Sequence, residues 1–378
     1  MFQPVFVSVG AVWFPLNRKN GTIHSDRGWN CQGEIKDMEA FKFYILVPVY
    51  KTENYIRECL DSILAQTYKN YAAVLVDDGT PDQAGIICDQ YALQDTRFHV
   101  IHKKNQGLLS ARRAAIDYVK ENCNQENAYF VFLDSDDYLK PEALQVLVDT
   151  ILQHDCDVVV YGLQRVFEGK VLSAVDPSPY VGVITDKREL YKRMFSKSLY
   201  NPLCRKAIKC NLMQAEDYSR FYHISMGEDL LQSIPVYKRC SKVAFIEDVL
   251  YNYTVNPASI TQSISFSKYE VDSTVRKEVW DFLETEEVLT QEDKTQYLQF
   301  CCNLLEKEVL KIGAFRTENE RIKSLLRQIK NDLYYSVLLN IENSSKVLML
   351  LNDEKYDLII AYAKLRLFLT KIKRKIVR

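Results

Sequence analysis

The chain has 378 residues and a net charge of −1 at pH 7; 47% of its residues are hydrophobic and 26% are charged. This length predicts two or three domains of about 100–200 residues each. The near-neutral charge argues against wholesale nucleic-acid binding, and the scarcity of Gly and Pro argues against a long linker. The ten cysteines form no C-x-x-C pair, so we expect free thiols in a reducing cytoplasm rather than disulfides.

Residues 1–40 precede the first regular pattern. The apolar run "PVFVSVGAVWFPL" lacks a preceding basic segment and a following small-residue cleavage site, so it does not resemble a signal peptide. At about 13 residues it is also too short to span a bilayer, and no other run reaches ~18 apolar residues. We therefore expect a poorly ordered extension over 1–40 and no transmembrane helix.

From residue 43 onward, strand-like apolar runs alternate with amphipathic helix-like runs, the first of which has Thr52 as its expected N-cap. This alternation predicts an α/β fold with a mostly parallel sheet that helices cover on both faces. Ligands bind such sheets at the carboxyl ends of the strands. The predicted strands cover 43–50, 71–80, 98–102, 128–133 and 157–167, and the predicted helices cover 52–68, 82–93, 106–122 and 141–154.

The pattern becomes less regular after Phe167. A helix is predicted near 227–240 and a Tyr-rich strand at 242–256. From about residue 262 onward, the pattern predicts charged helices. We therefore expect three regions. They are the extension over 1–40, an α/β domain over 41–261, and a C-terminal helical region over 262–378 with a basic tail.

Three carboxylates follow the fourth predicted strand, in "FLDSDD". We call Asp134, Asp136 and Asp137 the acidic cluster. Carboxylates this close repel one another, so one pKa would rise unless a cation lies among them. Mg²⁺ or Mn²⁺ binds one or two carboxylates together with phosphate oxygens. The cluster therefore predicts a metal that joins Asp134 and Asp136 to a phosphorylated ligand.

The acidic cluster also allows three other interpretations. A calcium-binding EF-hand loop is excluded because Tyr138 and Leu139 occupy positions that need Asp or Asn and then Gly. A phosphatase of the haloacid-dehalogenase type also has an apolar strand before D-x-D, but that strand usually begins its domain. Here three strand–helix units come first. A solvated turn that caps the helix at Pro141 stays open on these residues alone.

Each of three further segments allows two interpretations, one functional and one purely structural. "VLVDDGTPD" at 74–82 can present a carboxylate to a base edge, or it can be an ordinary turn. Tyr50 in "VPVY" can stack on a base, or pack at the rim of the sheet. Asp229 in "MGEDLL" can be a general base, or simply an acid placed in the first turn of a helix.

Several common sites are absent from the sequence. It contains no G-x-G-x-x-G and no G-x-x-x-x-G-K-[ST], so neither a dehydrogenase nor a P-loop ATPase is supported. The five histidines form no H-E-x-x-H and no zinc-binding spacing.

Five segments follow one another along the chain: "ILVPVYKTENYIRECLDSILAQTYKNYAAVLVDDGTPD", "NQGLLSARRAAI", "FLDSDD", "GEDLL" and "LYNYTVNPASIT". Taken together and in this order, they resemble a bacterial family 2 glycosyltransferase with a GT-A fold, over about residues 41–261. The chain departs from the common pattern at two positions. Lys51 stands where Asn often follows the Tyr, and Arg113 stands where Asn often follows Ala-Arg.

The resemblance implies roles for individual residues. Asp78 would read the uracil edge, Asp134 and Asp136 would hold Mg²⁺ or Mn²⁺ on the diphosphate, and Asp229 would be the catalytic base. The implied nucleotide-binding residues are Pro48, Val49, Tyr50, Glu53, Asp78, Arg112 and Ser135.

The implied function is metal-dependent, inverting transfer of a sugar from a nucleotide sugar, expected to be UDP-linked, to a hydroxyl group. The acceptor would be a glycan or a lipid-linked oligosaccharide in cell-surface polysaccharide assembly. Two alternatives are kept. A sugar-phosphate nucleotidyltransferase would need a Gly-rich basic loop after the first strand, and "VPVYKTEN" is not one. A degenerate nucleotide-sugar-binding module would bind without turnover.

The last eighteen residues, "AYAKLRLFLTKIKRKIVR", carry seven Lys or Arg and no acid. A basic amphipathic helix can lie on an anionic membrane, which would place a cytoplasmic protein on the inner face of the cell membrane. A solvated terminal helix, or one packed on the preceding helices, is the open alternative.

Overall fold

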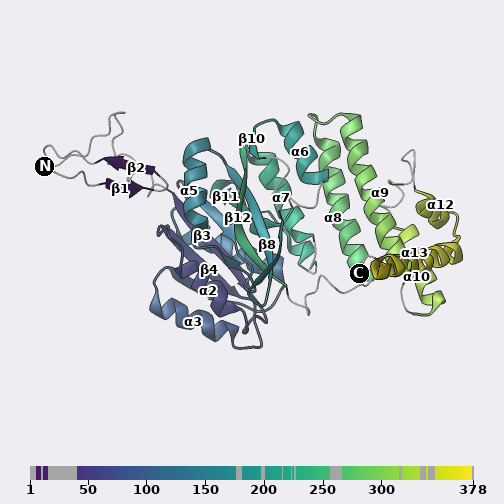
Figure 1. Ribbon diagram of the computed structural model, residues 1–378, viewed down its shortest axis with the longest axis horizontal. Helices are drawn as coiled ribbons and strands as arrows, with labels where there is room; N and C mark the ends of the chain where they lie inside the picture. Colours follow the sequence, from purple (N-terminus) through teal and green to yellow (C-terminus); the bar gives the residue numbers. More distant parts are fainter. Residues whose placement is uncertain are drawn as a thin grey trace, which may run out of the picture.

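The computed structural model describes residues 6–9, 12–15, 41–175, 181–196, 201–214, 216–222, 224, 227–255, 266–314, 317–332, 338 and 345–376. At the N-terminus, β1 (Phe6–Val9) and β2 (Val12–Pro15) pair antiparallel, apart from the main body (Figure 1). The rest of the extension predicted over 1–40 lies outside the described residues. Among the described helices, none combines the length and apolar character needed to cross a bilayer.

Four neighbouring strands form the parallel half of the main sheet, in the order β6-β3-β4-β5. They coincide with the predicted strands because their apolar side chains are buried, almost without interruption in β3, β4 and β6. The bounds are Lys42–Val49 for β3, Tyr71–Asp77 for β4, Phe98–His102 for β5 and Ala128–Phe132 for β6.

The other half of the sheet is mixed. The short strand β11 lies antiparallel between β6 and β8, and β12 then pairs parallel to β8. The α/β class is confirmed, although this half contains more antiparallel pairs than the sequence suggested. The bounds are Tyr138–Leu139 for β7, Val158–Phe167 for β8, Lys170–Val175 for β9, Gly182–Ile184 for β10, Lys206–Lys209 for β11 and Val243–Thr254 for β12.

Helices cover both faces of the sheet because alternate side chains of a strand point to opposite faces. In β3, Ile45 and Val47 belong to the core under α2, α3 and α5. Tyr44 and Leu46 belong to the core under α4 and α7. The bounds are Ile56–Leu64 for α2, Ala84–Gln94 for α3, Leu108–Asn122 for α4, Ala143–His154 for α5, Lys187–Ser196 for α6 and Glu228–Arg239 for α7.

The first helix of the sheet domain begins later than predicted. Helix α2 begins at Ile56, and its N-cap residue Tyr55 makes no side-chain cap. The Thr52 hydroxyl donates to Ser135 Oγ at 3.0 Å instead. The predicted N-cap at Thr52 is therefore wrong, because its hydroxyl joins the loop after β3 to the acidic cluster.

The C-terminal helices extend the core on the α4 side. Figure 1 shows α8 and α9 stacked beside α7, and Val279 of α8 and Leu305 of α9 belong to the same buried cluster as Leu46. The predicted helical character after residue 262 is confirmed in the described residues. The bounds are Phe266–Thr285 for α8, Gln291–Gly313 for α9, Asn319–Lys330 for α10, Lys346–Asn352 for α12 and Tyr356–Ile376 for α13.

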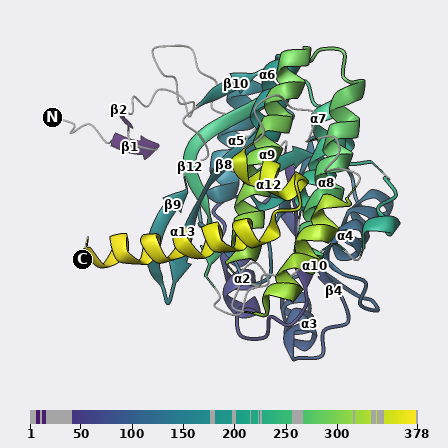
Figure 2. The ribbon, with the colours of Figure 1, turned by 90° about the vertical axis from the view of Figure 1, so that its right-hand side faces the viewer.

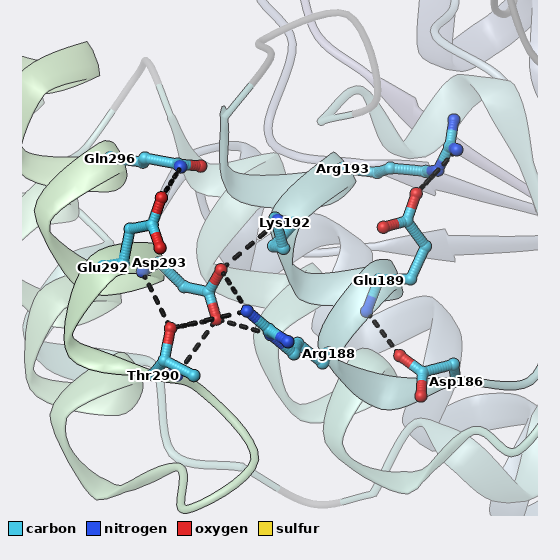
Figure 3. A network of polar contacts seen from close by, with 9 residues as sticks. All are labelled: Asp186, Arg188, Glu189, Lys192, Arg193, Thr290, Glu292, Asp293 and Gln296. Carbon is cyan, nitrogen blue, oxygen red and sulfur yellow. Dashed lines mark hydrogen bonds and ion pairs between the residues drawn. The ribbon is translucent and has the colours of Figure 1, made fainter.

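A polar network fastens the start of α9 to α6 (Figure 3). The buried Asp293 accepts hydrogen bonds from Arg188 Nε at 2.6 Å and from Thr290 N at 3.0 Å. Thr290 Oγ1 in turn accepts from Asp293 N, which completes a capping box. The Arg188 guanidinium and the bonds from Thr290 hold the pKa of Asp293 well below its usual range.

Replacing Asp293 by Asn is expected to lower the free energy of unfolding by about 1–3 kcal/mol at pH 7, because it removes a cap and a charged hydrogen bond. A carboxylate with a lowered pKa stabilises the fold above its unfolded pKa of about 3.9, and this stabilisation is lost as the pH falls below that value. Urea denaturation at pH 7 and pH 3.5 measures both effects.

The matched control is Glu292→Gln, because the exposed Glu292 accepts only a long 3.5 Å bond from Gln296 among the contacts in Figure 3. It should change stability by less than about 0.5 kcal/mol. Equal effects of the two substitutions would contradict a stabilising role for this network.

Candidate active site

The polar segments predicted at strand ends meet at one edge of the sheet. Because β3, β4 and β6 are parallel neighbours, their carboxyl ends lie side by side. Asp78 N donates to Val49 O at 3.0 Å, and Leu133 N donates to Leu46 O at 3.1 Å. The loops that carry Tyr50, Asp78 and the acidic cluster therefore start from adjacent positions.

Asp78 is buried and held by the segment between β5 and α4. Its carboxylate accepts from Lys103 Nζ at 2.6 Å, from Gly107 N at 2.8 Å and from Gln106 N at 3.1 Å. Gly107 has a φ of 93°, and a Cβ there would lie 2.8 Å from Tyr222 O. Only glycine suits this position, so the segment that fixes Asp78 has one tightly defined shape.

The loop after β3 is tied to the start of α3. Thr80 Oγ1 accepts from Lys51 N at 2.8 Å, and Glu53 Oε2 accepts from Gln83 N at 3.1 Å. Lys51 has a φ of 56°, a left-handed conformation that Asn adopts more readily than Lys. This geometry explains why Asn is the residue type that the resemblance leads one to expect there.

The residues predicted to line the nucleotide pocket differ in exposure. Tyr50 is exposed, with Lys51 Nζ 5.1 Å from the centre of its ring. Pro48 and Val49 are buried within β3, so their side chains belong to the sheet core. Ser135 is buried, and its hydroxyl accepts from Thr52. Tyr50 is thus an exposed aromatic side chain at this edge, and its ring can stack on a base.

Asp137 has a positioning role in the structure. The buried carboxylate accepts from Tyr251 Oη at 2.6 Å and from Thr254 N at 2.7 Å. Tyr251 Oη also accepts from Asp134 N at 3.2 Å. One hydroxyl of β12 therefore fixes both ends of the acidic cluster. Burial, and then the neighbouring Asp136 and Asp134, raise the pKa of Asp137.

Arg112 of α4 joins the acidic cluster to α7. Its Nη2 donates to Asp134 Oδ1 at 3.1 Å, and its Nη1 donates to Asp229 Oδ1 at 2.5 Å. The arginine side chain is only 2% exposed, whereas those of Asp134 and Asp229 are 32% and 24% exposed. The sequence predicts a divalent cation as the countercharge for these carboxylates. The structure shows that part of this charge comes from Arg112.

The contacts of Arg112 are relevant to its predicted role in nucleotide binding. The guanidinium faces Asp134, Asp229 and Gln232, and it is buried beneath these side chains. Direct contact with a nucleotide stays a prediction.

The acidic cluster suits a divalent metal by the chemistry of its donors. Asp136 is half-buried, and among the described residues no side chain donates to its carboxylate. Burial and Asp134 raise the pKa of Asp136 to about 6. Burial also raises the pKa of Asp134, while Arg112 opposes this rise.

In the described part of the chain, no group of three or more Asp, Glu, His or Cys side chains is arranged so that it could hold a metal ion by itself. Two carboxylates nevertheless match the way Mg²⁺ binds when phosphate and water supply the other oxygens.

Two buried ionisable groups are not predicted by any pattern in the sequence. Burial and Asp229 raise the pKa of Glu228 to about 7, and one of its carboxylate oxygens has no hydrogen-bond partner among the residues that the structure describes. Burial lowers the pKa of Lys206 to about 7. Lys206 Nζ donates to Pro202 O at 2.9 Å and to Ser233 Oγ at 3.4 Å, and so contacts the second turn of α7.

Comparisons with known proteins find glycosyltransferases among the relatives of this chain. Residues 44–214 match the model of the family described as glycosyl transferase family 2. The chain is 30% identical to glycosyltransferase GlyG of Streptococcus pneumoniae over 58% of this chain and 72% of GlyG. It is 26% identical to the poly(ribitol-phosphate) beta-glucosyltransferase of Bacillus spizizenii, over 60% of this chain and 34% of that protein. The chain spans 32% and 62% of the length of two further curated glycosyltransferases.

A solved structure supports the fold. S. aureus TarS 1–349, in complex with UDP-GlcNAc, superposes with a TM-score of 0.64 at 18% identity, over 85% of this chain and 90% of that chain. This likeness confirms the predicted GT-A architecture. Together, the match to the family model and the 30% identity to GlyG over 72% of its length show that the chain belongs to glycosyltransferase family 2.

Proposed function

We propose that the chain is an inverting, metal-dependent glycosyltransferase. It would transfer a sugar from a nucleotide sugar, UDP-linked by preference, to a hydroxyl of a glycan or lipid-linked acceptor in cell-surface polysaccharide assembly. The observation that carries the proposal is that one guanidinium, that of Arg112, binds both Asp134 and Asp229. Two residues far apart in the sequence, the expected metal ligand and the expected base, are thereby neighbours.

In the proposed reaction, Asp229 accepts the proton of the acceptor hydroxyl as the hydroxyl oxygen bonds to the anomeric carbon. The bond from that carbon to the diphosphate oxygen breaks, and the nucleoside diphosphate leaves with the electron pair. The position of Asp229 in the first turn of α7, with a partly exposed carboxylate, suits this role. Asp78 and Tyr50 would hold the base, and the complex of TarS with UDP-GlcNAc supports a donor of this class.

Asp134 and Asp136 would hold Mg²⁺ or Mn²⁺. When bound, such an ion supplies positive charge against the diphosphate that leaves. Arg112 keeps Asp134 in place for this purpose, and Tyr251 and Asp137 fix the backbone between the two ligands.

Replacing Asp136 by Asn is expected to weaken Mn²⁺-dependent UDP binding at least about tenfold, because a half-buried metal ligand is lost. For the unaltered chain, the affinity for UDP with Mn²⁺ should fall as the pH drops below 6, since the pKa of Asp136 is about 6. Isothermal titration of UDP from pH 5 to 8, with Mn²⁺ and with a chelator, measures both effects.

The control is Asp149→Asn, an exposed carboxylate of α5 that accepts a hydrogen bond from Gln145. It should leave UDP binding unchanged. Identical UDP affinity in Mn²⁺ and in chelator would refute the metal dependence, whatever the variants do.

A further inference from the structure

Among the described side chains of helix α13, those that pack on the molecule lie in its first half. Its buried residues Tyr356, Ile359, Ile360 and Ala363 belong to the core shared with α9, α10 and α12. α9 meets α13 closely at Gly313, where an added Cβ would lie 3.0 Å from Ala363 Cβ. Beyond Ala363, the described side chains as far as 372 are exposed, and Figure 2 shows the helix projecting from the body.

The projecting helix carries a second apolar face. Leu358, Tyr362, Leu365, Leu369 and Ile372 recur at intervals of four, three, four and three residues, which places them on one side of a helix. We call these five residues the outer stripe. Their side chains are 38–55% exposed. The helical repeat places the outer stripe opposite the residues that face α9, so it is not part of the packing interface.

The charged side chains that the structure describes between Leu358 and Ile372 are Lys364 and Arg366, and both are exposed. The sequence has no Asp or Glu from residue 358 to residue 378. A second copy of this helix would bring like charges together, at an unfavourable electrostatic cost. An anionic lipid surface would complement them. The basic residues are Lys364, Arg366, Lys371, Lys373, Arg374, Lys375 and Arg378.

We propose that α13 is a peripheral membrane anchor whose outer stripe inserts among the lipids of an anionic bilayer. The arrangement has the marks of an interfacial helix, namely an apolar face flanked by Lys and Arg. The proposal is independent of the transfer reaction.

The test is co-sedimentation of the full chain with vesicles of phosphatidylcholine alone and with 30% phosphatidylglycerol. The outer-stripe variant combines Leu365→Gln, Leu369→Gln and Ile372→Gln. We expect the unaltered chain to bind the anionic vesicles and this variant to bind at least about tenfold more weakly, because three apolar side chains no longer leave water. Replacing Lys371, Lys373, Arg374 and Lys375 by Gln should also weaken binding at least about tenfold.

The matched control replaces three exposed apolar residues of α3 and α5 in the same way: Ile86→Gln, Leu93→Gln and Leu152→Gln. It should bind vesicles like the unaltered chain. UDP binding in solution should be unchanged in every variant, so that loss of the anchor is distinguishable from failure of the proposed function.

Three results would overturn the anchor. They are equal binding by the outer-stripe variant and the unaltered chain, equal binding to neutral and anionic vesicles, and no vesicle binding at all. Sedimentation velocity adds a fourth. If the unaltered chain forms a dimer that the outer-stripe variant loses, a second copy covers the outer stripe.

Discussion

Replacing Asp229 by Asn is expected to lower kcat about 10³-fold while the affinity for UDP changes by less than about twofold. General-base catalysis typically contributes 10²–10⁴-fold, and an amide cannot take the proton of the acceptor hydroxyl. Asn retains the shape of Asp and one oxygen to accept the bond from Arg112 Nη1, so the fold of the site should persist. Initial rates with a nucleotide sugar and acceptor, combined with UDP titration, separate the two effects.

The adjacent Glu228 provides the sharpest control for the base. It occupies the same turn of α7 but is more buried than Asp229, and its pKa is raised to about 7. Gln resembles the protonated form that Glu228 already adopts in part near neutral pH. Glu228→Gln should therefore lower kcat less than about tenfold. A larger loss for Glu228→Gln than for Asp229→Asn would assign the base to Glu228.

Replacing Arg112 by Gln is expected to lower the free energy of unfolding by about 3 kcal/mol at pH 8, because it leaves carboxylates in a buried site without their cation. The same change should abolish turnover, since Asp134 and Asp229 lose the group that holds them together. Arg112→Lys keeps the charge, but an ammonium lacks the planar fork that reaches both carboxylates. We expect it to restore stability in part and turnover very little.

The pH dependence distinguishes electrostatics from packing at Arg112. Burial raises the pKa of Asp134, and Arg112 opposes this rise, so removing Arg112 raises that pKa further. An acid with a raised pKa destabilises the fold at pH values above its unfolded pKa, about 3.9 for Asp. The stability deficit of Arg112→Gln should therefore shrink as the pH falls from 8 toward 4. A deficit that stays constant over this range would indicate lost packing.

The adjacent Arg113 is the control for this experiment. It is more exposed than Arg112, pairs with Asp117 of the same helix and donates to Glu216 O at 2.7 Å. Neither contact leaves a buried charge without its partner when Arg113 is replaced, so Arg113→Gln should lower the free energy of unfolding by less than about 1.5 kcal/mol.

The sequence predicted the parallel half of the sheet because each strand is a short apolar run that ends in a polar turn. The positions of Asp78 and of the acidic cluster follow from the same rule, since parallel neighbours share their carboxyl edge. The mixed half was harder to predict. Strand β11 is only "KAIK", and a four-residue run with Lys at both ends carries no clear periodicity.

The pairing of Arg112 with Asp229 could not be predicted from spacing. The two side chains lie on different helices, 117 positions apart, and no local pattern reports such a contact. Lys206 likewise looks like an exposed strand residue in the sequence but is buried in the structure. The network around Asp293 did have a signal, because Thr290 followed three residues later by an acid resembles a capping box.

The hydroxyl of Tyr251 has a consequence for the order in which the site is assembled. Tyr251 lies 114 positions after Asp137, to which it donates. At synthesis rates of about 5–20 residues per second, roughly 6–23 s separate the two residues on the ribosome. β3, β4, β5 and β6 all emerge before that interval, whereas β12 emerges only at its end. A nascent chain can thus form the parallel strands while Asp137 still lacks the two hydrogen bonds that β12 donates to it. The acidic cluster therefore reaches its final geometry only after β12 has been synthesised.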